Sequence, residues 1–365
     1  GGAITSPGTG TNDIVIGGVW RLSITSATAI GADTGADGEV DSTWLSSTVP
    51  EVSGIAADGN IYYSNNASLN LSGAVTNAAL TPAIHLSTGT GTLTTGAGGS
   101  ITAGSGGAGT VALTADDLVL GALVTADGGI TLRPETVAKT IGLNDGAGDF
   151  NLTEAELLLL DSTGVVTIGR MDGSGAINIG SLGAINLAAT SYDLTLRGSA
   201  APVVFNLGAG DSLTLADGKT LTLGGGGAIT SPGVGTNDIV IGGAGVLSIT
   251  SATAIGADTG VDGEVDSTWL SSTVPEVSGI AADGDIYYRN NNASLNLSGA
   301  VTNAALTPAI HLSTGTGTLT TGGSITAGAA GAGTVAITGN DLALGDVVTA
   351  DGGITLRPET VAKTI

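Results

Sequence analysis

The first 141 residues of this 365-residue chain occur twice. Residues 1–141 return as residues 226–365, and both copies begin with GGAITSPG and end with DGGITLRPETVAKTI. They differ at about fifteen positions, and the second copy has one extra Asn and lacks two residues near positions 96–99. Long internal repeats are typical of solenoids and arrays rather than of a closed domain. We therefore divide the chain into a first copy (1–141), the remainder of the first period (142–225) and a truncated second copy (226–365), and we expect an internal fragment of a longer array.

The part of the chain that is not duplicated alternates apolar and polar residues. Segments such as VVTIG, AINIG, YDLTLRG and KTLTLGG follow one another from residue 165 onward, at intervals of about eight to eleven residues. Alternation with period two marks a strand with one buried face, and the intervening Thr, Asn and Ser suit a solvated face. We expect the following side chains to point inward: Val166, Ile168, Ile177, Ile179, Ile185, Leu187, Leu194, Leu196, Val203, Phe205, Leu207, Leu213, Leu215, Leu221, Leu223, Ile239 and Ile241.

Two architectures use many short strands at this spacing, a sandwich or barrel and a β-solenoid. Aromatic residues make up only 3% of the chain, which is too few to fill a wide sandwich, and the unit repeats without a sign of closure. We predict an all-β fold: a right-handed parallel β-helix (β-solenoid) rod with protruding loops. Its coils would take roughly 18 to 27 residues and stack about 4.8 Å apart. The right hand follows from the handedness of parallel crossover connections.

Charge and composition exclude several classes of function. The chain has 32 Asp and Glu against nine Lys and Arg, so we expect no basic surface for nucleic acid or anionic lipid. It has no cysteine for disulfide or thiol chemistry, and no run of about 18 apolar residues that would insert into a membrane. Charged residues make up 11% and hydrophobic residues 41%, which argues against disorder. A silk-like or elastin-like polymer is the alternative, which the regular alternation disfavours.

Asp-Gly dipeptides punctuate the chain. They begin at Asp37, Asp58, Asp127, Asp145, Asp172, Asp217, Asp262, Asp283 and Asp351. Asp bonds its local backbone and Gly takes positive φ, so we interpret each pair as a tight corner. Calcium binding is the alternative, but the calcium-binding nonapeptide pattern does not repeat here. We therefore expect no cofactor, and calcium has no motif to support it.

Residues 31–63 interrupt the regular pattern with an acidic run, a proline and several aromatic residues. The aromatic residues of interest in this segment and its copy are Trp44, Tyr62, Tyr63, Trp269, Tyr287 and Tyr288. Several of them do not fit a slim core, so we expect the segment to bulge from the shaft. It is then a candidate contact loop for a ligand or a neighbouring filament. The alternative is that the segment covers the flank of the solenoid.

Residues 150–164 (FNLTEAELLLLDSTG) are the only stretch with helical character. The run of four leucines is equally compatible with a strand that is buried on both faces. Because strands are expected on both sides, we favour a short strand with a bulged loop.

No nucleotide, metal or nucleophile motif passes a test of context. A GxGxxG match at residues 104–109 is broken by two alanines in the second copy, and the GKT tripeptide at residues 218–220 lacks the first Gly of a P-loop. His85 and His311 are equivalent positions with no HExxH, GxSxG or second His nearby. We interpret each as a half-buried, hydrogen-bonded residue on a strand.

Carboxylate pairs are similarly weak candidates for catalysis. Glu154 with Glu156, and Asp116 with Asp117, are conceivable acid/base pairs, but Asp116 becomes Asn340 in the second copy. β-Helical enzymes that act on polysaccharides present basic residues in the substrate groove, whereas this chain has nine in total. Ice binding would need a TxT ladder at one coil period, which the Thr residues do not form. We predict that the chain is not an enzyme.

The segments LTADDLVLGALVTADGGITLRPETVAKTIGLNDGAGDFNL and DSTGVVTIGRMDGSGAINIGSLGAINL resemble the repeats of very large bacterial surface proteins. These are the filamentous-haemagglutinin-like, β-strand-repeat adhesins, secreted by two-partner or autotransporter routes. The resemblance covers essentially the whole chain as a style of sequence rich in Gly, Thr and Asn. It implies a right-handed β-helical shaft, an extracellular or bacterial cell-surface location, and a role in adhesion, biofilm or surface fibres. It carries over no functional residue.

Two functions therefore stay open. The first is a structural extracellular filament or fibre subunit, whose partner is another copy of itself, end to end or side by side, because an open sheet edge pairs readily with another chain. The second is an adhesin shaft in which residues 31–63 and their copy bind glycans or proteins of a host or neighbouring cell. A polysaccharide-active β-helix enzyme is the third alternative.

Overall fold

The structure is a computed structural model, and it describes residues 2–6, 12–34, 43–104, 107–231, 237–259, 268–291, 294–328 and 331–359. The acidic run at residues 35–42 and its copy at 260–267, with Asp37 and Asp262, lie outside the described residues, as do residues 105–106 of the GxGxxG match and their copies Ala329 and Ala330. The chain forms two compact units. Unit 1 comprises residues 1–141, 149–170 and 190–193, and unit 2 comprises residues 142–148, 171–189 and 194–365.

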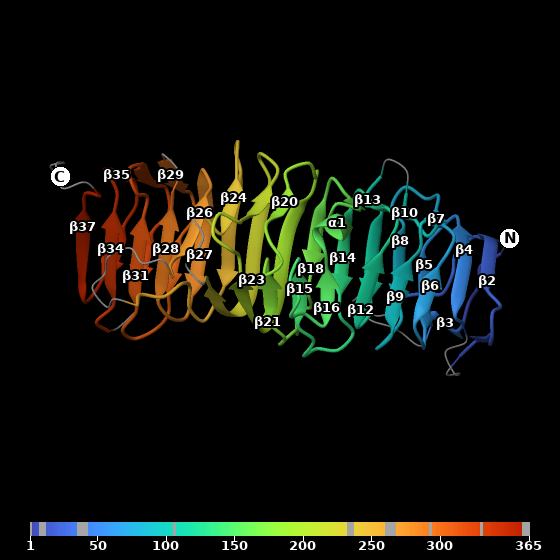
Figure 1. Cartoon of the computed structure of the whole chain (residues 1–365). Coiled ribbons are helices and arrows are strands. Elements are labelled where there is room, and N and C mark those ends of the chain that lie inside the picture. Colours follow the sequence, from blue (N-terminus) through green and yellow to red (C-terminus); the bar gives the residue numbers. More distant parts are fainter. Residues whose placement is uncertain are drawn as a thin grey trace. The chain divides into compact units, whose positions relative to one another are not determined.

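Unit 1 is built from three ladders of paired strands (Figure 1). The first contains β1 (Ile14–Val15), β3 (Leu45–Thr48), β5 (Ile61–Asn65), β8 (Ala83–Ser87), β11 (Thr110–Thr114), β14 (Gly129–Arg133) and β18 (Val165–Ile168). The second contains β2 (Leu22–Ala27), β4 (Glu51–Ala57), β6 (Leu69–Leu71), β9 (Thr92–Thr95) and β12 (Asp117–Leu120), against which β16 (Phe150–Leu152) packs. The third contains β4, β7 (Val75–Asn77), β10 (Ile101–Ala103), β13 (Val124–Ala126) and β17 (Leu160–Asp161).

Unit 2 repeats this organisation. One sheet contains β20 (Ile185–Leu187), β22 (Leu213–Leu215), β24 (Ile239–Ile241), β26 (Leu270–Thr273), β28 (Ile286–Asn290), β31 (Ala309–Ser313), β34 (Thr334–Thr338) and β37 (Gly353–Arg357). A second ladder contains β21 (Asp193–Phe205), β23 (Thr220–Thr230), β25 (Val246–Ser251), β27 (Glu276–Ala282), β29 (Ser294–Leu297), β32 (Thr318–Thr321) and β35 (Asp341–Leu344). A third contains β27, β30 (Val301–Asn303), β33 (Ile325–Ala327) and β36 (Val348–Ala350), while β15 (Ile141–Leu143), β19 (Ile177–Ile179) and β21 form a fourth.

The pairings within both units are parallel, and many keep one register along the whole strand. Register shifts occur between β2 and β4 and along the series β21, β23, β25 and β27. In unit 1, for example, Ile61 pairs with Ile84, Ile84 with Val111, and Val111 with Ile130. Residues paired between neighbouring strands of a ladder are 18 to 36 residues apart in sequence. The longest coil is therefore longer than the roughly 18 to 27 residues expected for one coil. The described part of the chain is thus nearly all-β, with long sheets of parallel strands, as the alternating pattern predicts.

The predicted inward positions are confirmed. All seventeen side chains named from the alternation between Val166 and Ile241 are at most 2% exposed. Their neighbours in the strands, mostly Thr and Asn, are partly or fully exposed, as in β20 and β22. Burial of these Val, Ile and Leu side chains, at roughly 1.5–3 kcal/mol each, is the main favourable term that holds the ladders together.

The prediction of a strand for the leucine run at residues 157–160 is wrong in part. A short helix, α1 (Glu154–Leu157), separates β16 from β17. Thr153 and Glu156 form a reciprocal capping box: the Thr153 hydroxyl accepts from the Glu156 N–H, and the Glu156 carboxylate accepts from the Thr153 N–H at 2.8 Å. The T-x-x-E pattern is a helix start signal, and it overrides the strand context on both sides.

The Asp-Gly dipeptides form corners for a reason that differs from the expected one. Among their described glycines, only Gly218 has positive φ, at +73°. At Gly59 a Cβ would instead lie 2.7 Å from the Thr28 carbonyl oxygen, and at Gly164, which ends another corner, 2.9 Å from that of Asp127. Glycine is therefore needed mainly because consecutive backbones approach closely at the corners.

No helix in the described part of the chain is long and apolar enough to cross a membrane.

Candidate functional site

An aromatic–histidine cluster lies on the first ladder of unit 1 and recurs in unit 2. Trp44 precedes β3, Tyr62 lies in β5 and His85 lies in β8, where the parallel register pairs it with Tyr62. The ring centroids are 5.6 Å apart for Trp44 and Tyr62, 5.8 Å for Trp44 and His85, and 5.1 Å for Tyr62 and His85. Tilted and edge-on contacts at these separations stabilise aromatic pairs.

The second copy reproduces this cluster with Trp269, Tyr287 and His311. The corresponding separations are 5.6, 5.7 and 5.0 Å. Because the copies lie in different units and differ at about fifteen positions elsewhere, the agreement indicates that the register of the ladder fixes the cluster.

The structure places most of the candidate contact-loop residues inside the fold. Trp44 and Trp269 are 2% exposed, and Tyr63 and Tyr288 are 0% exposed. Only Tyr62 and Tyr287 are half-buried. The described residues from Leu45 to Tyr63 lie mostly in regular strands rather than in a protruding loop. This placement agrees with the alternative that the segment covers a flank, and it leaves Tyr62 and Tyr287 as the aromatic rings within reach of a ligand.

The two adjacent tyrosines differ because successive strand residues point to opposite faces. Tyr63 points inward, where its hydroxyl is hydrogen-bonded to the Ser47 hydroxyl. The Asn65 amide completes this buried network by accepting from the Ser47 hydroxyl at 2.8 Å and from the Val49 N–H at 2.9 Å. Burial raises the pKa of the Tyr63 hydroxyl to about 12, although its bond to Ser47 opposes the rise. Tyr63 is therefore structural.

The two histidines are half-buried, as expected, but the predicted hydrogen bond is not found at one ring nitrogen. The Nδ1 atoms of His85 and His311 are buried without a hydrogen-bond partner among the described residues. Burial lowers the pKa of both imidazoles, and the nearby Arg133 and Arg357 act in the same direction, while Asp33 and Asp258 oppose them. Both rings are therefore neutral at pH 7.

Stability is expected to fall as the pH drops below about 6.5, the ordinary pKa of histidine. The folded-state pKa of His85 and His311 is lowered, so the unfolded chain binds protons at these residues more tightly than the folded chain does. The contribution of the two neutral histidines to the free energy of unfolding is fully present above the pKa of the unfolded chain, and it is lost progressively as the pH falls below that value. Urea unfolding followed by far-ultraviolet circular dichroism at pH 7.5 and pH 5 measures the loss.

A double variant, His85→Gln with His311→Gln, is the control for this prediction. It retains the carboxylates, including Asp238, whose pKa is raised by burial and whose titration therefore acts in the opposite direction. The decrease in stability between the two pH values should be smaller in the variant than in the parent chain. An equal decrease in both proteins would show that the histidines do not cause it.

The cluster of the second copy borders a hollow of about 390 Å³. The residues that line it are Asp258, Tyr287, His311, Thr334, Val335, Ala336, Gly352, Gly353, Thr355 and Arg357. Burial raises the pKa of the Tyr287 hydroxyl to about 12, with the negative charges of Asp285 and Asp258 adding to the effect, so this phenol stays protonated. The hollow thus combines a neutral phenol, a neutral imidazole, one carboxylate and one guanidinium.

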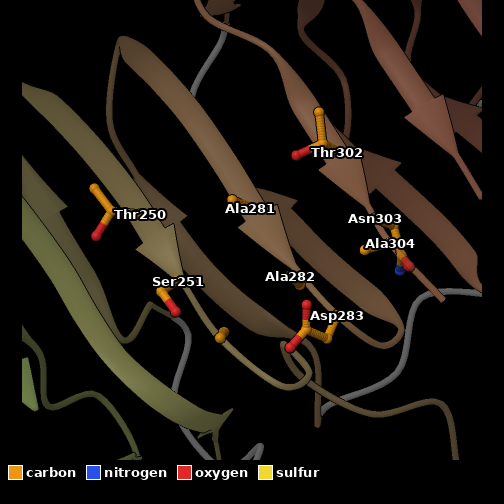
Figure 2. A pocket seen from close by; sticks show the side chains of 9 residues that line it. Thr250, Ser251, Ala281, Ala282, Asp283, Thr302, Asn303 and Ala304 are labelled. Carbon is orange, nitrogen blue, oxygen red and sulfur yellow. The ribbon is translucent and has the colours of Figure 1, made fainter. Parts of the chain in front are cut away.

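A second kind of groove occurs once in each copy. Figure 2 shows the one in unit 2, where Thr250, Ala281 and Thr302 lie side by side on β25, β27 and β30, with Asp283 and Asn303 at the strand ends. Its volume is about 260 Å³, and the groove formed by the identical residues of the first copy measures about 250 Å³. Both grooves are open and lined mainly by small side chains, so they offer few groups that would hold a ligand.

Two of the four carboxylates considered for catalysis, those of Asp116 and Glu156, have structural roles. The Asp116 carboxylate accepts from the backbone N–H and the hydroxyl of Thr136, both at 2.7 Å. The Glu156 carboxylate caps α1 and accepts from the Leu120 N–H at 2.9 Å. Among the described residues, no group of three or more His, Asp or Glu side chains is arranged to hold a metal ion.

Comparison with known proteins finds no matching family model, no matching curated protein and no matching solved structure. The site therefore has to be interpreted from its own geometry. Sequence reasoning missed the histidine as a partner of the aromatic residues. The available signal was the pairing of the IYYSN and AIHLS segments as adjacent strands, which brings Tyr62 and His85 together.

Proposed function

We propose that this chain is a structural segment of an extracellular filament or surface fibre, built as a right-handed β-solenoid whose coils stack on one another. The parallel ladders support this architecture, because each strand within a ladder bonds the strand before it and the strand after it. The right hand rests on the general handedness of parallel crossover connections. The fibre would serve cell-surface adhesion or scaffold a biofilm matrix, as in the bacterial surface adhesins that the repeats resemble.

The two copies show how much apolar surface a following coil buries. In unit 1, Leu120 is 4% exposed and Ile130 is 1% exposed, because β16, β17 and β18 follow and cover this coil. The equivalent Leu344 and Ile354 in unit 2 are 40% and 47% exposed. The coil that follows in unit 1 therefore closes the apolar core over these two positions.

The charge of the chain is consistent with another copy of the chain as its partner. With a net charge of −23, the surface repels nucleic acid and anionic lipid, and like-charged shafts stay apart at low salt. Coil-to-coil stacking depends instead on backbone hydrogen bonds and apolar side chains, which salt screens little. Divalent cations could bridge neighbouring shafts, although the described residues form no dedicated metal site.

A matched pair of substitutions tests what an added coil contributes. Ile130→Ala is expected to lower the free energy of unfolding by about 3 kcal/mol, because it leaves a cavity in a closed core. Ile354→Ala, the same change at the exposed equivalent, is expected to cost less than about 1 kcal/mol. Urea unfolding of both variants measures the difference. Equal costs would mean that the next coil does not bury this position.

Assembly itself is tested with Ile354→Lys. The parent chain is expected to form fibres whose diffraction shows a repeat near 4.8 Å along the fibre axis. Placing a charge on the exposed apolar edge should abolish the fibres and leave the circular dichroism spectrum unchanged. Ala343→Lys, an exposed outward position on β35, is the control and should leave fibre formation intact. Absence of the 4.8 Å repeat in the parent protein would rule out the stacked-coil architecture.

A further inference from the structure

We infer that each aromatic–histidine cluster binds one buried water molecule between its tryptophan and its histidine. The water accepts a hydrogen bond from the indole Nε1–H and donates one to the imidazole Nδ1. The observation behind it concerns four buried atoms: Nε1 of Trp44 and Trp269, and Nδ1 of His85 and His311, have no hydrogen-bond partner in the described part of the chain. The inference applies to both copies and does not depend on fibre formation.

Both sites lie within a ladder, with strands on either side of them. Trp44 immediately precedes β3, Tyr62 lies in β5 and His85 in β8, and these strands pair in this order. β1 pairs with β3 on one side, and β11 pairs with β8 on the other. The second copy has the same order, with β24, β26, β28, β31 and β34. A further coil at either end of the array would therefore leave both sites unchanged.

Burial makes the unpaired nitrogens unfavourable. Trp44 and Trp269 are both 2% exposed, so bulk solvent does not reach their indole N–H groups. A buried donor without a partner is destabilising, and the indole N–H is a donor only. The unprotonated nitrogen of a neutral imidazole is an acceptor. A single molecule that accepts from the one group and donates to the other satisfies both, which is the usual role of buried water.

The separation of the rings suits one water molecule. Two hydrogen bonds of about 2.9 Å that meet at a tetrahedral oxygen span nitrogens roughly 4.5–5 Å apart. The tryptophan and histidine ring centroids are 5.8 Å apart in the first copy and 5.7 Å apart in the second. Each nitrogen lies off the centroid of its ring, so two rings at this separation can place their nitrogens at that span.

The bridge determines the tautomer of each histidine. Burial lowers the pKa of both imidazoles, so each ring is neutral at pH 7 and carries one proton. The water oxygen accepts from the indole, and one of its hydrogens is then donated to Nδ1. Nδ1 of His85 and His311 therefore carries no proton, and the ring proton is on Nε2.

Nuclear magnetic resonance of the unassembled parent chain tests the inference, because the sequence contains three tryptophans and two histidines. The indole protons of Trp44 and Trp269 should exchange slowly with solvent and still show a nuclear Overhauser cross-peak to water. Trp20, which is 73% exposed, is the control and should exchange rapidly. Long-range proton–nitrogen correlation should show an unprotonated Nδ1 in both histidines.

Two matched substitutions separate the water bridge from ring packing. Trp44→Phe removes the N–H and keeps an aromatic ring, so it should shift the Nδ1 resonance of His85 and leave that of His311 unchanged. Trp269→Phe should do the reverse. Tyr62→Phe alters a ring that contacts the same histidine but leaves the bridge in place. It should shift Nδ1 of His85 less than Trp44→Phe does, and the cross-peak of Trp44 to water should persist.

Tyr62→Phe also controls for relayed exchange, because a phenol hydroxyl can pass solvent magnetisation to a nearby indole. The inference is overturned if either buried indole lacks a cross-peak to water, or if the Trp44 cross-peak disappears in Tyr62→Phe. It is also overturned if Nδ1 carries the proton, or if Trp44→Phe leaves Nδ1 of His85 unchanged. Because the measurement uses the unassembled chain, fibre formation and the water site can fail separately.

Discussion

Replacing Gly31 by alanine is expected to lower the free energy of unfolding of unit 1 by about 3 to 4 kcal/mol. Gly31 has a φ of +63°, a conformation that costs an L-residue roughly 1–2 kcal/mol. A Cβ at this position would also clash with the Tyr62 carbonyl oxygen and lie 2.9 Å from the Leu45 nitrogen. Both neighbours are backbone atoms of the ladder and cannot rotate away, so relief requires moving a strand, at a further cost of about 1–3 kcal/mol.

Gly89→Ala is the matched control for this prediction. Gly89 has a similar φ of +56°, but nothing lies within 4 Å of its Cβ position, so only the conformational cost of about 1 kcal/mol remains. Gly256→Ala repeats the test in unit 2, where φ is +62° and the equivalent backbone atoms, the Tyr287 carbonyl oxygen and the Leu270 nitrogen, crowd the site. Urea unfolding with separate probes for the two units measures the losses. A cost at Gly31 no greater than that at Gly89 would show that the ladder can yield at this point.

Replacing Asn65 by alanine is expected to cost about 3 kcal/mol, because it leaves several buried backbone groups without partners. The Asn65 amide accepts from the Val49 N–H at 2.9 Å and donates to the Val49 carbonyl at 3.0 Å and to the Ala67 carbonyl at 2.8 Å. Water cannot replace these bonds in a buried site. The amide therefore ties the end of one strand to the connection between two others.

The second copy predicts the same loss for Asn290→Ala, where the amide bonds Val274 at 3.1 and 2.8 Å. Asn70→Ala is the control, because Asn70 points outward from β6 and should change stability by no more than about 0.5 kcal/mol. Thermal unfolding and amide hydrogen exchange at Val49 report the effect. Unchanged protection of the Val49 amide in Asn65→Ala would contradict the proposed role.

The strands of this fold could be predicted because their signal is local. An inward residue at every second position marks a strand whatever the rest of the chain does, and all seventeen positions named from Val166 to Ile241 are buried. The helix at Glu154–Leu157 was missed because its signal, the capping box of Thr153 and Glu156, competed with stronger strand context. A short capped helix needs only one turn of sequence, which a search for longer periodicity passes over.

The site could not be predicted because it depends on which strand lies beside which. Trp44, Tyr62 and His85 are separated by many residues, and their contact follows from the lengths of the connections between β3, β5 and β8. An exposed role for Trp44 and Tyr63 was inferred from ring size alone. The structure has room for both rings inside because the neighbouring positions Ser47 and Gly31 are small.

The corner between β9 and β10 shows how such a chain can change without losing its fold. The second copy lacks two residues here, yet Leu295 pairs with Leu319 as Leu69 pairs with Leu93, and Val301 pairs with Ile325 as Val75 pairs with Ile101. The corner accommodates the difference in length, and the pairing of the next strand is unchanged. Foreign peptides can therefore be inserted at corners of this kind. Gene duplication can likewise add whole periods to the array, because the core contacts within each period stay the same.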